Sequence, residues 1–345
     1  MKRIGTESAT KGGLRWRRLL MPLFFSVGVV TVSDAFAGDY SGHEGVQGVI
    51  AAAAEAGVDP TWSRDLIEAA ERQQSILDAI ARPAEKTKPW YEYRKIFLTE
   101  RRIREGAAFW DANASVLETV AERTGVPSEI IVAIIGVETY YGRISGSYRV
   151  IDALATLAFD YPRRSAFFTR ELEQFLVLAW ESNKDPLAMK GSYAGAMGYG
   201  QFMPSSYRAY ATSFEGGSAP DIWDDVADAI SSVGNYLKAH GWRAGDGVVV
   251  DAIADDAEPA IFDAGLKPSL SVAELALAGV RPVEALMPST VVTPLRLEEQ
   301  SGLRHWLGLQ NFYVITRYNH SAMYAMAIWE LSQALVTERS YEYSR

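Results

Sequence analysis

The chain has 345 residues, of which 48% are hydrophobic and 22% charged, and its formal net charge is −9. This composition is typical of a globular protein and excludes a disordered or fibrous chain. The absence of cysteine excludes disulfides, cysteine-ligated metal sites and a lipid anchor on cysteine. The acidic balance disfavours nucleic acid as a partner.

The first 37 residues resemble a secretory leader. Basic residues precede an apolar run from Leu19 to about Val32, and the small-residue pattern "AFA" follows. This order predicts a signal peptide over residues 1–37, cleaved to leave a chain from about Gly38. A transmembrane anchor is the alternative, but the run is short for a membrane span. Without the leader the chain has 28 basic and 41 acidic residues, a net charge of −13. We expect an exported, soluble, periplasmic protein without a lipid anchor.

Residues 38–244 are predicted to be helical. Helical patterns continue from about Gly45 to Gly241, interrupted by glycine and proline at short connections. One helix is expected to begin near Pro127, because proline suits the first helical turn, and to end near Gly142.

Residues 245–317 have a different character. The stretches "GVVV", "STVVTPLRL" and "NFYVITRY" are rich in the β-branched and aromatic residues typical of strands, and "LSVAELALAGV" predicts one short helix between them. We therefore expect a small α+β insertion here. Residues 318–345 contain "HSAMYAMAIWELSQAL", a helical pattern that should pack back on the helical body. No apolar run after the leader is long enough to span a membrane.

Glu138 is the first candidate for chemistry. In "VAIIGVETYYGR" it follows Ile131, Ile134 and Ile135 at the spacing of one helical stripe, so a costly carboxylate shares an apolar face. Two interpretations are open: a carboxylate that reaches solvent at a helix end, or a general acid kept protonated by its surroundings. The aromatic rings of Tyr140 and Tyr141 are suited to a sugar ligand.

Three further stretches contain candidate residues. The glycines in "KGSYAGAMGYGQFMPSSY" permit close approach to a ligand, or simply a flexible connection. Arg163 and Arg164 in "YPRRSAFF" suit carboxylate recognition, although pairing with Glu171 or Glu173 at a solvated helix start is equally open. The polar and aromatic stretch "TRYNHSAMY", considered alone, is more typical of core and cap.

Other classes of active site do not match the sequence. The four histidines are widely separated and lack zinc-ligand spacing. The glycine-rich stretch has neither the ending of a phosphate loop nor a complete dinucleotide fingerprint, and no Gly-x-Ser-x-Gly motif occurs.

Several motifs in one order, from about Gly45 to the last helix, resemble those of the membrane-bound lytic transglycosylase B family. They are "IIGVETYYGR", "DALATLAFDYPRRSAFF", "KGSYAGAMGYGQFMPSSYRAYA", "SSVGNYLKAHGW" and "FYVITRYNHSAMYAMAIWEL". The resemblance implies a mainly α fold, with a lysozyme-like helical core, an additional α region and a small α+β insertion. It also implies cleavage of the bond between N-acetylmuramic acid and N-acetylglucosamine in peptidoglycan, leaving 1,6-anhydromuramic ends.

The same resemblance assigns roles to individual residues. Glu138 matches the catalytic glutamate, which serves first as acid and then as base. The positions that match substrate-binding residues are Tyr93, Arg163, Arg164, Ser192, Gln201, Tyr236, Tyr318, Asn319 and Tyr324. Peptidoglycan glycan strands are the implied ligand, and proteins of cell-wall synthesis are candidate partners.

One departure from the family concerns metal binding. Family members can carry an acidic calcium loop after the glycine-rich motif, but here "SFEGGSAPDIWDD" has Ser213 and Gly217 where acids are expected. We therefore predict no cofactor and no metal. Two alternative functions remain: a muramidase that adds water across the same bond, and an inactive peptidoglycan-binding or scaffold protein.

Overall fold

The structure is a computed structural model that describes residues 38–81, 88–182, 184–217 and 219–342. The predicted signal peptide lies outside the described residues. Among the described residues, no helix is long and apolar enough to cross a membrane.

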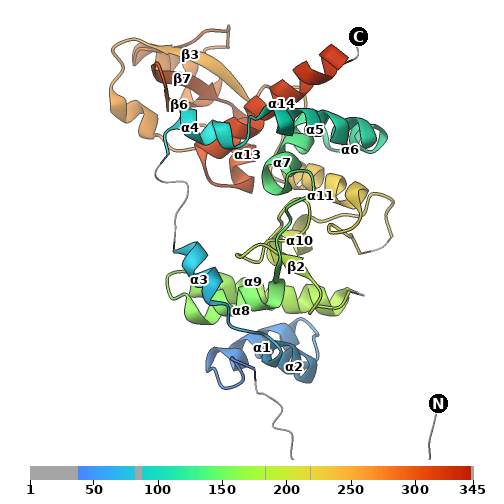
Figure 1. Cartoon of the computed structure of the whole chain (residues 1–345). Coiled ribbons are helices and arrows are strands. Elements are labelled where there is room, and N and C mark those ends of the chain that lie inside the picture. The colour runs from blue at the N-terminus through green and yellow to red at the C-terminus, as the bar shows by residue number, and fades with distance from the viewer. Residues whose placement is uncertain (1–37, 82–87, 183, 218, 343–345) are drawn as a thin grey trace, which may run out of the picture. The chain divides into compact units, whose positions relative to one another are not determined.

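Short helices dominate the chain before the sheet, as predicted (Figure 1). In chain order the helices and the two short strands are α1 (Gly45–Glu55), α2 (Pro60–Glu68), α3 (Gln74–Ile80), α4 (Trp90–Tyr93), η1 (Arg94–Ile96, a 3-10 helix), α5 (Glu100–Ala112), α6 (Ala114–Thr124), α7 (Ser128–Thr139), β1 (Tyr148–Arg149), α8 (Val150–Asp160), α9 (Ser165–Glu181), β2 (Lys190–Gly191), α10 (Pro204–Tyr210) and α11 (Val226–Ala239). The strands β1 and β2 pair with each other antiparallel.

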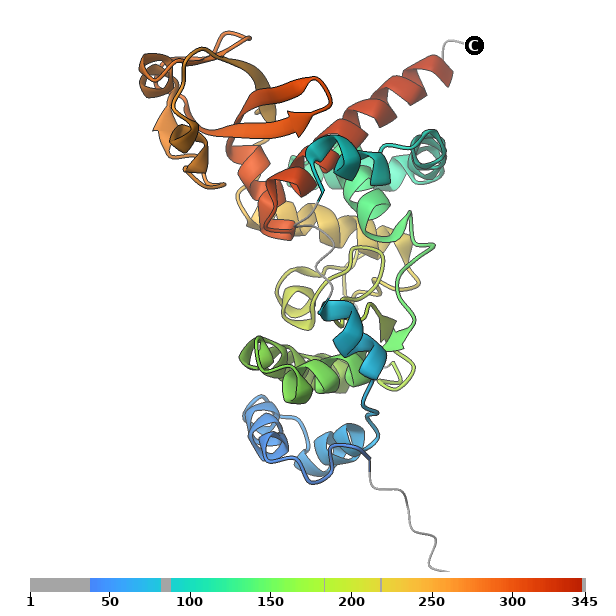
Figure 2. The same cartoon turned by 60° about the vertical axis from the view of Figure 1, so that its left-hand side comes forward.

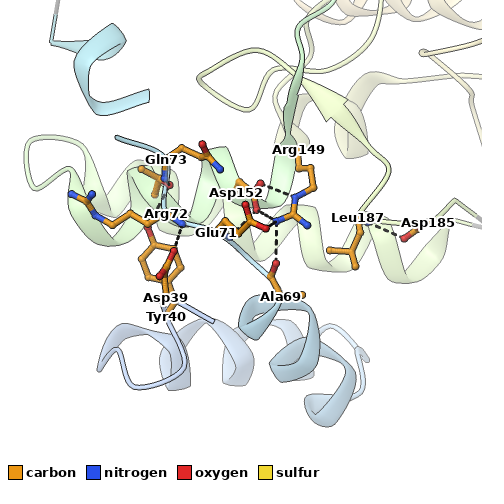
Figure 3. Close-up of polar contacts among 11 residues, drawn as sticks. Asp39, Tyr40, Ala69, Glu71, Arg72, Gln73, Arg149, Asp152, Asp185 and Leu187 are labelled. Atoms are coloured by element: carbon orange, nitrogen blue, oxygen red, sulfur yellow. Dashed lines mark hydrogen bonds and ion pairs between the residues drawn. The ribbon is translucent and has the colours of Figure 1, made fainter. Parts of the chain in front are cut away.

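Helices α1 to α3 contact the pair α8 and α9 through packing and through buried polar groups. The Glu71 backbone N–H donates a hydrogen bond to Asp152 Oδ1 at 2.9 Å (Figure 3). The Arg149 guanidinium pairs with the same carboxylate at 2.7 Å and donates to the Ala69 carbonyl oxygen at 3.1 Å. Asp152 is almost fully buried, and these donors compensate for the loss of water around its charge.

Helix α7 carries Glu138 and packs against α5, α6, α11 and α14 (Figures 1 and 2). Nine of its 12 residues are buried, so the helix is enclosed on all sides and not only on the face that periodicity predicted. Its start beside Pro127 is confirmed. The predicted end near Gly142 is wrong, because Tyr140 adopts a left-handed conformation and ends the helix at Thr139.

The strands within residues 249–308 form an antiparallel sheet with strand order β4-β6-β7-β3-β5. Its elements are β3 (Val249–Ala254), η2 (Pro259–Asp263, a 3-10 helix), β4 (Leu270–Ser271), α12 (Val272–Leu277), β5 (Val280–Pro282), β6 (Val291–Glu299) and β7 (Gly302–Gly308). The predicted strands in "GVVV" and "STVVTPLRL" and the predicted short helix are confirmed, whereas β7 was not predicted.

The sheet buries both faces. Trp306 and Leu307 are neighbours on β7 and therefore point to opposite sides. Trp306 belongs to the large hydrophobic core of the helices, and Leu307 belongs to a smaller core with Leu275 of α12.

The stretch "NFYVITRY" is a helix, α13 (Gln310–Tyr318), so its prediction as strand is wrong. Phe312, Val314 and Ile315 are fully buried in the large core. Phe312 and Ile315 are three positions apart, which places both on one helical face, and this packing outweighs the strand preference of the β-branched residues. The last helix, α14 (Ala322–Glu342), packs on α13, α5 and α7, which confirms the helix predicted there (Figure 2).

Candidate active site

Glu138 and Tyr324 form the central contact of the site. Glu138 lies in the last turn of α7 and is half-buried, as its position in the sequence predicted. The Tyr324 hydroxyl, on α14, donates a hydrogen bond to Glu138 Oε1 at 2.6 Å. Burial, together with the negative charge of Glu138, raises the pKa of Tyr324 well above its usual 10. The phenol therefore stays protonated and remains a hydrogen-bond donor.

Two further tyrosines connect this pair to the glycine-rich loop. The Tyr318 hydroxyl donates to the Gly200 carbonyl oxygen at 2.6 Å, and the Tyr236 ring centroid lies 4.7 Å from that of Tyr318. Burial raises the pKa of Tyr236 to about 12, and burial followed by the charge of Glu138 raises the pKa of Tyr318 well above 10. The predicted residues Tyr236, Tyr318 and Tyr324 are thus neutral; the last two are close enough to Glu138 for its charge to affect them, and Tyr236 packs on Tyr318.

The end of α7 is fixed by an unusual backbone. Tyr140 and Tyr141 have φ angles of 54° and 60°, in the left-handed region that bulky residues rarely adopt. Thr139 Oγ1 donates to the Tyr199 carbonyl oxygen at 2.9 Å and accepts from the Gly142 N–H at 3.0 Å. These bonds attach the helix end beside Glu138 to the glycine-rich loop.

An arginine-rich cluster supports this helix end from α5. The Arg102 guanidinium carbon lies 4.6 Å from the Tyr140 ring centroid, and the Tyr141 hydroxyl donates to the Arg102 carbonyl oxygen at 3.0 Å. Glu105 pairs with Arg143 at 2.6 Å. Sequence reasoning missed this cluster, because no spacing pattern relates α5 to the residues after α7.

Ser192 and Gln201 both build the glycine-rich loop. Ser192 Oγ accepts hydrogen bonds from the Ala194 and Ala196 N–H groups at 3.3 and 3.1 Å. Gln201 has a left-handed φ of 51°, and its Nε2 donates to the Ser145 carbonyl oxygen at 3.1 Å. Each side chain therefore holds the loop in a defined shape.

Tyr93 and Asn319 border the tyrosine group. Tyr93 ends α4 and is 3% exposed, and its phenol is close enough to contribute to the raised pKa of Tyr324. Asn319 follows α13 and is half-buried, and its carbonyl oxygen accepts from the Ser321 N–H at 2.8 Å.

Comparison with known proteins identifies the family. The sequence profile described as "Transglycosylase SLT domain" matches residues 41–333. The chain belongs to this family. It is 46% identical over 292 residues to "Membrane-bound lytic murein transglycosylase B" of Escherichia coli strain K12, an alignment that covers 82% of this chain and 80% of that protein.

Two solved structures from Pseudomonas aeruginosa place this SLT-domain protein among lytic transglycosylases. The catenated lytic transglycosylase SltB1 is 48% identical, with a TM-score of 0.82 over 87% of this chain and 100% of that one. SltB3 in complex with NAG-anhNAM-pentapeptide is 30% identical, with a TM-score of 0.75 over 84% and 78% of the two chains. The predicted family and the predicted fold class, mainly α with a lysozyme-like helical core, are confirmed.

Arg163 and Arg164 lie apart from the tyrosine group in this SLT-domain protein. Both are exposed at the connection between α8 and α9, and the Arg164 guanidinium carbon lies 4.3 Å from the Phe167 ring centroid. The alternative pairing with Glu171 is wrong, because that carboxylate accepts hydrogen bonds from Ser205 instead. No contact within the described part of the chain joins either arginine to Glu138.

Carboxylates in and just after the stretch "SFEGGSAPDIWDD" accept hydrogen bonds from backbone amides. Asp228 accepts hydrogen bonds from the Phe214 and Asp221 N–H groups at 2.7 and 2.8 Å. Asp225 accepts from the Ala227 N–H at 2.8 Å. Calcium takes six to eight oxygen ligands, and these carboxylates are already directed at backbone amides. That no calcium binds there stays a prediction.

Proposed function

We propose that this SLT-domain protein is a lytic murein transglycosylase in which Glu138 performs both proton transfers. The observation that carries the proposal is the contact between Glu138 and Tyr324, which holds a half-buried carboxyl group in one orientation at a helix end. The family membership, and the SltB3 complex with NAG-anhNAM-pentapeptide, support peptidoglycan as the substrate.

The reaction requires no water. Glu138 protonates the glycosidic oxygen between N-acetylmuramic acid and N-acetylglucosamine, and the bond from that oxygen to C1 breaks. The C6 hydroxyl of the muramic residue attacks C1, and Glu138 recovers a proton from it, so that proton transfer balances over the cycle. A second carboxylate is not needed as in common glycosidases, because the nucleophile belongs to the substrate.

Several finer assignments belong to the same proposal. Tyr93, Ser192, Gln201, Tyr236, Tyr318 and Asn319 are proposed to line the substrate site, and Arg163 and Arg164 to meet a carboxylate farther along it. We also propose export by a leader cleaved after residue 37, a soluble periplasmic product, a helical region over 38–244 and an insertion over 245–317.

Mass spectrometry of the products tests the reaction. Purified peptidoglycan digested with the full-length protein should yield anhydromuramic ends. Ends heavier by one water would establish the muramidase alternative instead.

The Glu138→Gln variant should lose about 10²- to 10⁴-fold in rate. If this variant were as active as the wild type, Glu138 would have no part in the mechanism. If neither protein turned over, the scaffold alternative would hold.

A further inference from the structure

A cavity of about 390 Å³ lies beside the glycine-rich loop. Its walls come from the loop after α7, the segment between α9 and β2, and the residues before α11. They are Ser145, Gly146, Lys184, Asp185, Ala188, Met189, Lys190, Trp223 and Asp224. The volume is in the range of sites that hold small ligands.

The cavity shares a wall with the proposed substrate site. The Ser145 carbonyl oxygen, on the cavity side, accepts the hydrogen bond from Gln201 Nε2 at 3.1 Å. Gly146 packs directly on the next strand: a Cβ atom there would lie 2.0 Å from the Gly191 carbonyl oxygen. The backbone that positions Gln201 and Ser192 therefore also forms the cavity.

Trp223 offers a fixed aromatic surface in this cavity. Its indole N–H donates to the Lys190 carbonyl oxygen at 3.2 Å, and its ring packs 5.7 Å from the Tyr207 ring. The ring is only half-buried. The Lys184 ammonium lies over the ring, 5.8 Å from its centroid. A fixed, partly exposed aromatic ring with an ammonium donor beside it suits a sugar, whose C–H groups can pack on the exposed part of the ring while a hydroxyl accepts from the lysine.

The charges around Trp223 cancel. Lys184 pairs with Asp221 at 2.7 Å and with Asp224 at 3.0 Å. The Lys190 ammonium is exposed and has no ion pair with any described residue, and Asp185 lies in the opposite segment of the wall. Two lysines and two aspartates line the cavity, which provides donors and acceptors without net charge. That pattern matches an uncharged polyhydroxyl ligand better than an anionic one.

We propose that this cavity is an additional saccharide subsite that takes an uncharged N-acetylhexosamine residue of the glycan strand, stacked on Trp223. The proposal rests on the proposed function, since it places this sugar farther along the same strand whose bond Glu138 cleaves. The subsite strengthens binding of long strands and leaves binding of short ones unaffected.

The test measures binding of N-acetylglucosamine oligomers of two to six units by calorimetry. The protein is full-length and carries Glu138→Gln, so that no probe is consumed. In this background Trp223→Ala should weaken binding of the hexamer by about tenfold, which corresponds to about 1.4 kcal/mol, and should leave the dimer unchanged. Lys190→Ala should weaken hexamer binding by a smaller factor in the same direction.

Trp180→Ala is the matched control. Trp180 is 44% exposed, lies in the last turn of α9 and packs on Trp62, outside the cavity. Its removal should change no affinity. Equal affinities for the hexamer with and without Trp223, or an equal loss for all lengths, would overturn the proposal. If Trp223→Ala did not fold, Trp223→Leu, which keeps an apolar side chain without an aromatic face, would decide in the same way together with Lys190→Ala.

Product analysis separates this proposal from the proposed function. Trp223→Ala with Glu138 intact should still form anhydromuramic ends from peptidoglycan. If the wild type formed none, the proposed reaction would fail, yet a length-dependent loss of oligomer binding in Trp223→Ala would still establish the subsite.

Discussion

Glu138 experiences two opposing influences from its surroundings. Ile134 and Ile135, one turn earlier on α7, belong to the fully buried core, and by the helical spacing we expect them to disfavour a charge on the carboxyl group. The hydrogen bond from Tyr324 favours the charged carboxylate. A group that must give up a proton and then take one back needs both forms to be accessible. The sequence alone suggested only the first influence, through the isoleucines.

The Tyr324→Phe substitution tests the effect of the hydrogen bond from Tyr324 to Glu138. Because a hydrogen bond to a charged group contributes about 1.5–3 kcal/mol, we expect kcat to fall by roughly ten- to a hundredfold, with little change in KM. The donor favours the carboxylate, so its loss should also move the basic limb of the pH–rate profile to higher pH. Steady-state kinetics from roughly pH 4 to 9, a range that begins near the ordinary glutamate pKa of about 4.3, provide both measurements.

Tyr207→Phe is the control for that substitution. Its hydroxyl also donates to an oxygen inside the protein, the Pro220 carbonyl at 2.6 Å, but it has no contact with Glu138. The pH profile of this variant should match the wild type. An unshifted profile in Tyr324→Phe would mean that the tyrosine only packs against Glu138.

At the scale of single residues, the helical spacing and the family resemblance each predicted different residues of the site. The helical spacing marked Glu138 as a costly carboxylate, and it did so without any family information. Tyr324 is 186 positions away in sequence, so only the resemblance could place it in the site. Arg102 and Trp223 had no signal of either kind, because their roles depend on which chain segments meet in the folded protein.

At the scale of elements, the end of α7 depends on α5. The Glu105 carboxylate of α5 forms an ion pair with Arg143, just after α7, and accepts a hydrogen bond from Arg101. These two arginines, with Arg143 the larger cause, lower the pKa of Glu105 from about 4.5 to about 2. A carboxylate with a lowered pKa stabilises the fold above the pKa of the unfolded chain, and this contribution disappears as pH falls toward 2.

Glu105→Gln should therefore lower the midpoint of thermal unfolding at neutral pH. The difference from the wild type should shrink below about pH 4.5 and vanish only below about pH 2, where the wild-type carboxylate becomes protonated as well. Calorimetry at pH 7, 4 and 3, values chosen roughly to bracket that titration, measures it. Glu100→Gln is the control for loss of a charge on the same helix. It removes an ion pair with Arg104 at 3.9 Å and a negative charge in the first turn of α5, but the Glu100 side chain is 94% exposed, so the effect should be small. If the unfolding midpoints of Glu105→Gln and the wild type differed by the same amount at every pH, the role given to the Glu105 charge would be contradicted.

Whether a segment is helix or strand was predictable where one spacing of hydrophobic residues dominated its sequence. The helices before the sheet and α14 follow their patterns, whereas α13 does not, because its β-branched residues favour strand when considered locally. Burial of Phe312 and Ile315 in the large core decides its conformation, and that core is formed by residues distant in sequence. The position of α7 in the core was likewise visible only once its neighbours were known.

At the scale of the whole molecule, the sheet separates two hydrophobic cores. The large core extends through the helices and includes Leu295 and Trp306 from one face of the sheet. The small core lies on the other face and contains Leu275 and Leu307. Glu138 and Tyr324 are on helices of the large core, so we expect stability of the small core to be separable from activity.

Leu275→Ala and Leu117→Ala test this separation, because each removes the same atoms from a fully buried position, one in each core. Each should cost about 2–5 kcal/mol in its own region. Leu275→Ala should accelerate amide hydrogen exchange in residues 249–308 and leave the rate of peptidoglycan cleavage near that of the wild type. Leu117→Ala should instead accelerate exchange in α6, α7 and α11, which pack together, and lower activity. Faster exchange in α7 and α14 of the Leu275→Ala variant would contradict this separation and show that the two cores unfold together. In that case the loss of packing in the small core would reach the helices that hold Glu138 through Trp306 of the sheet.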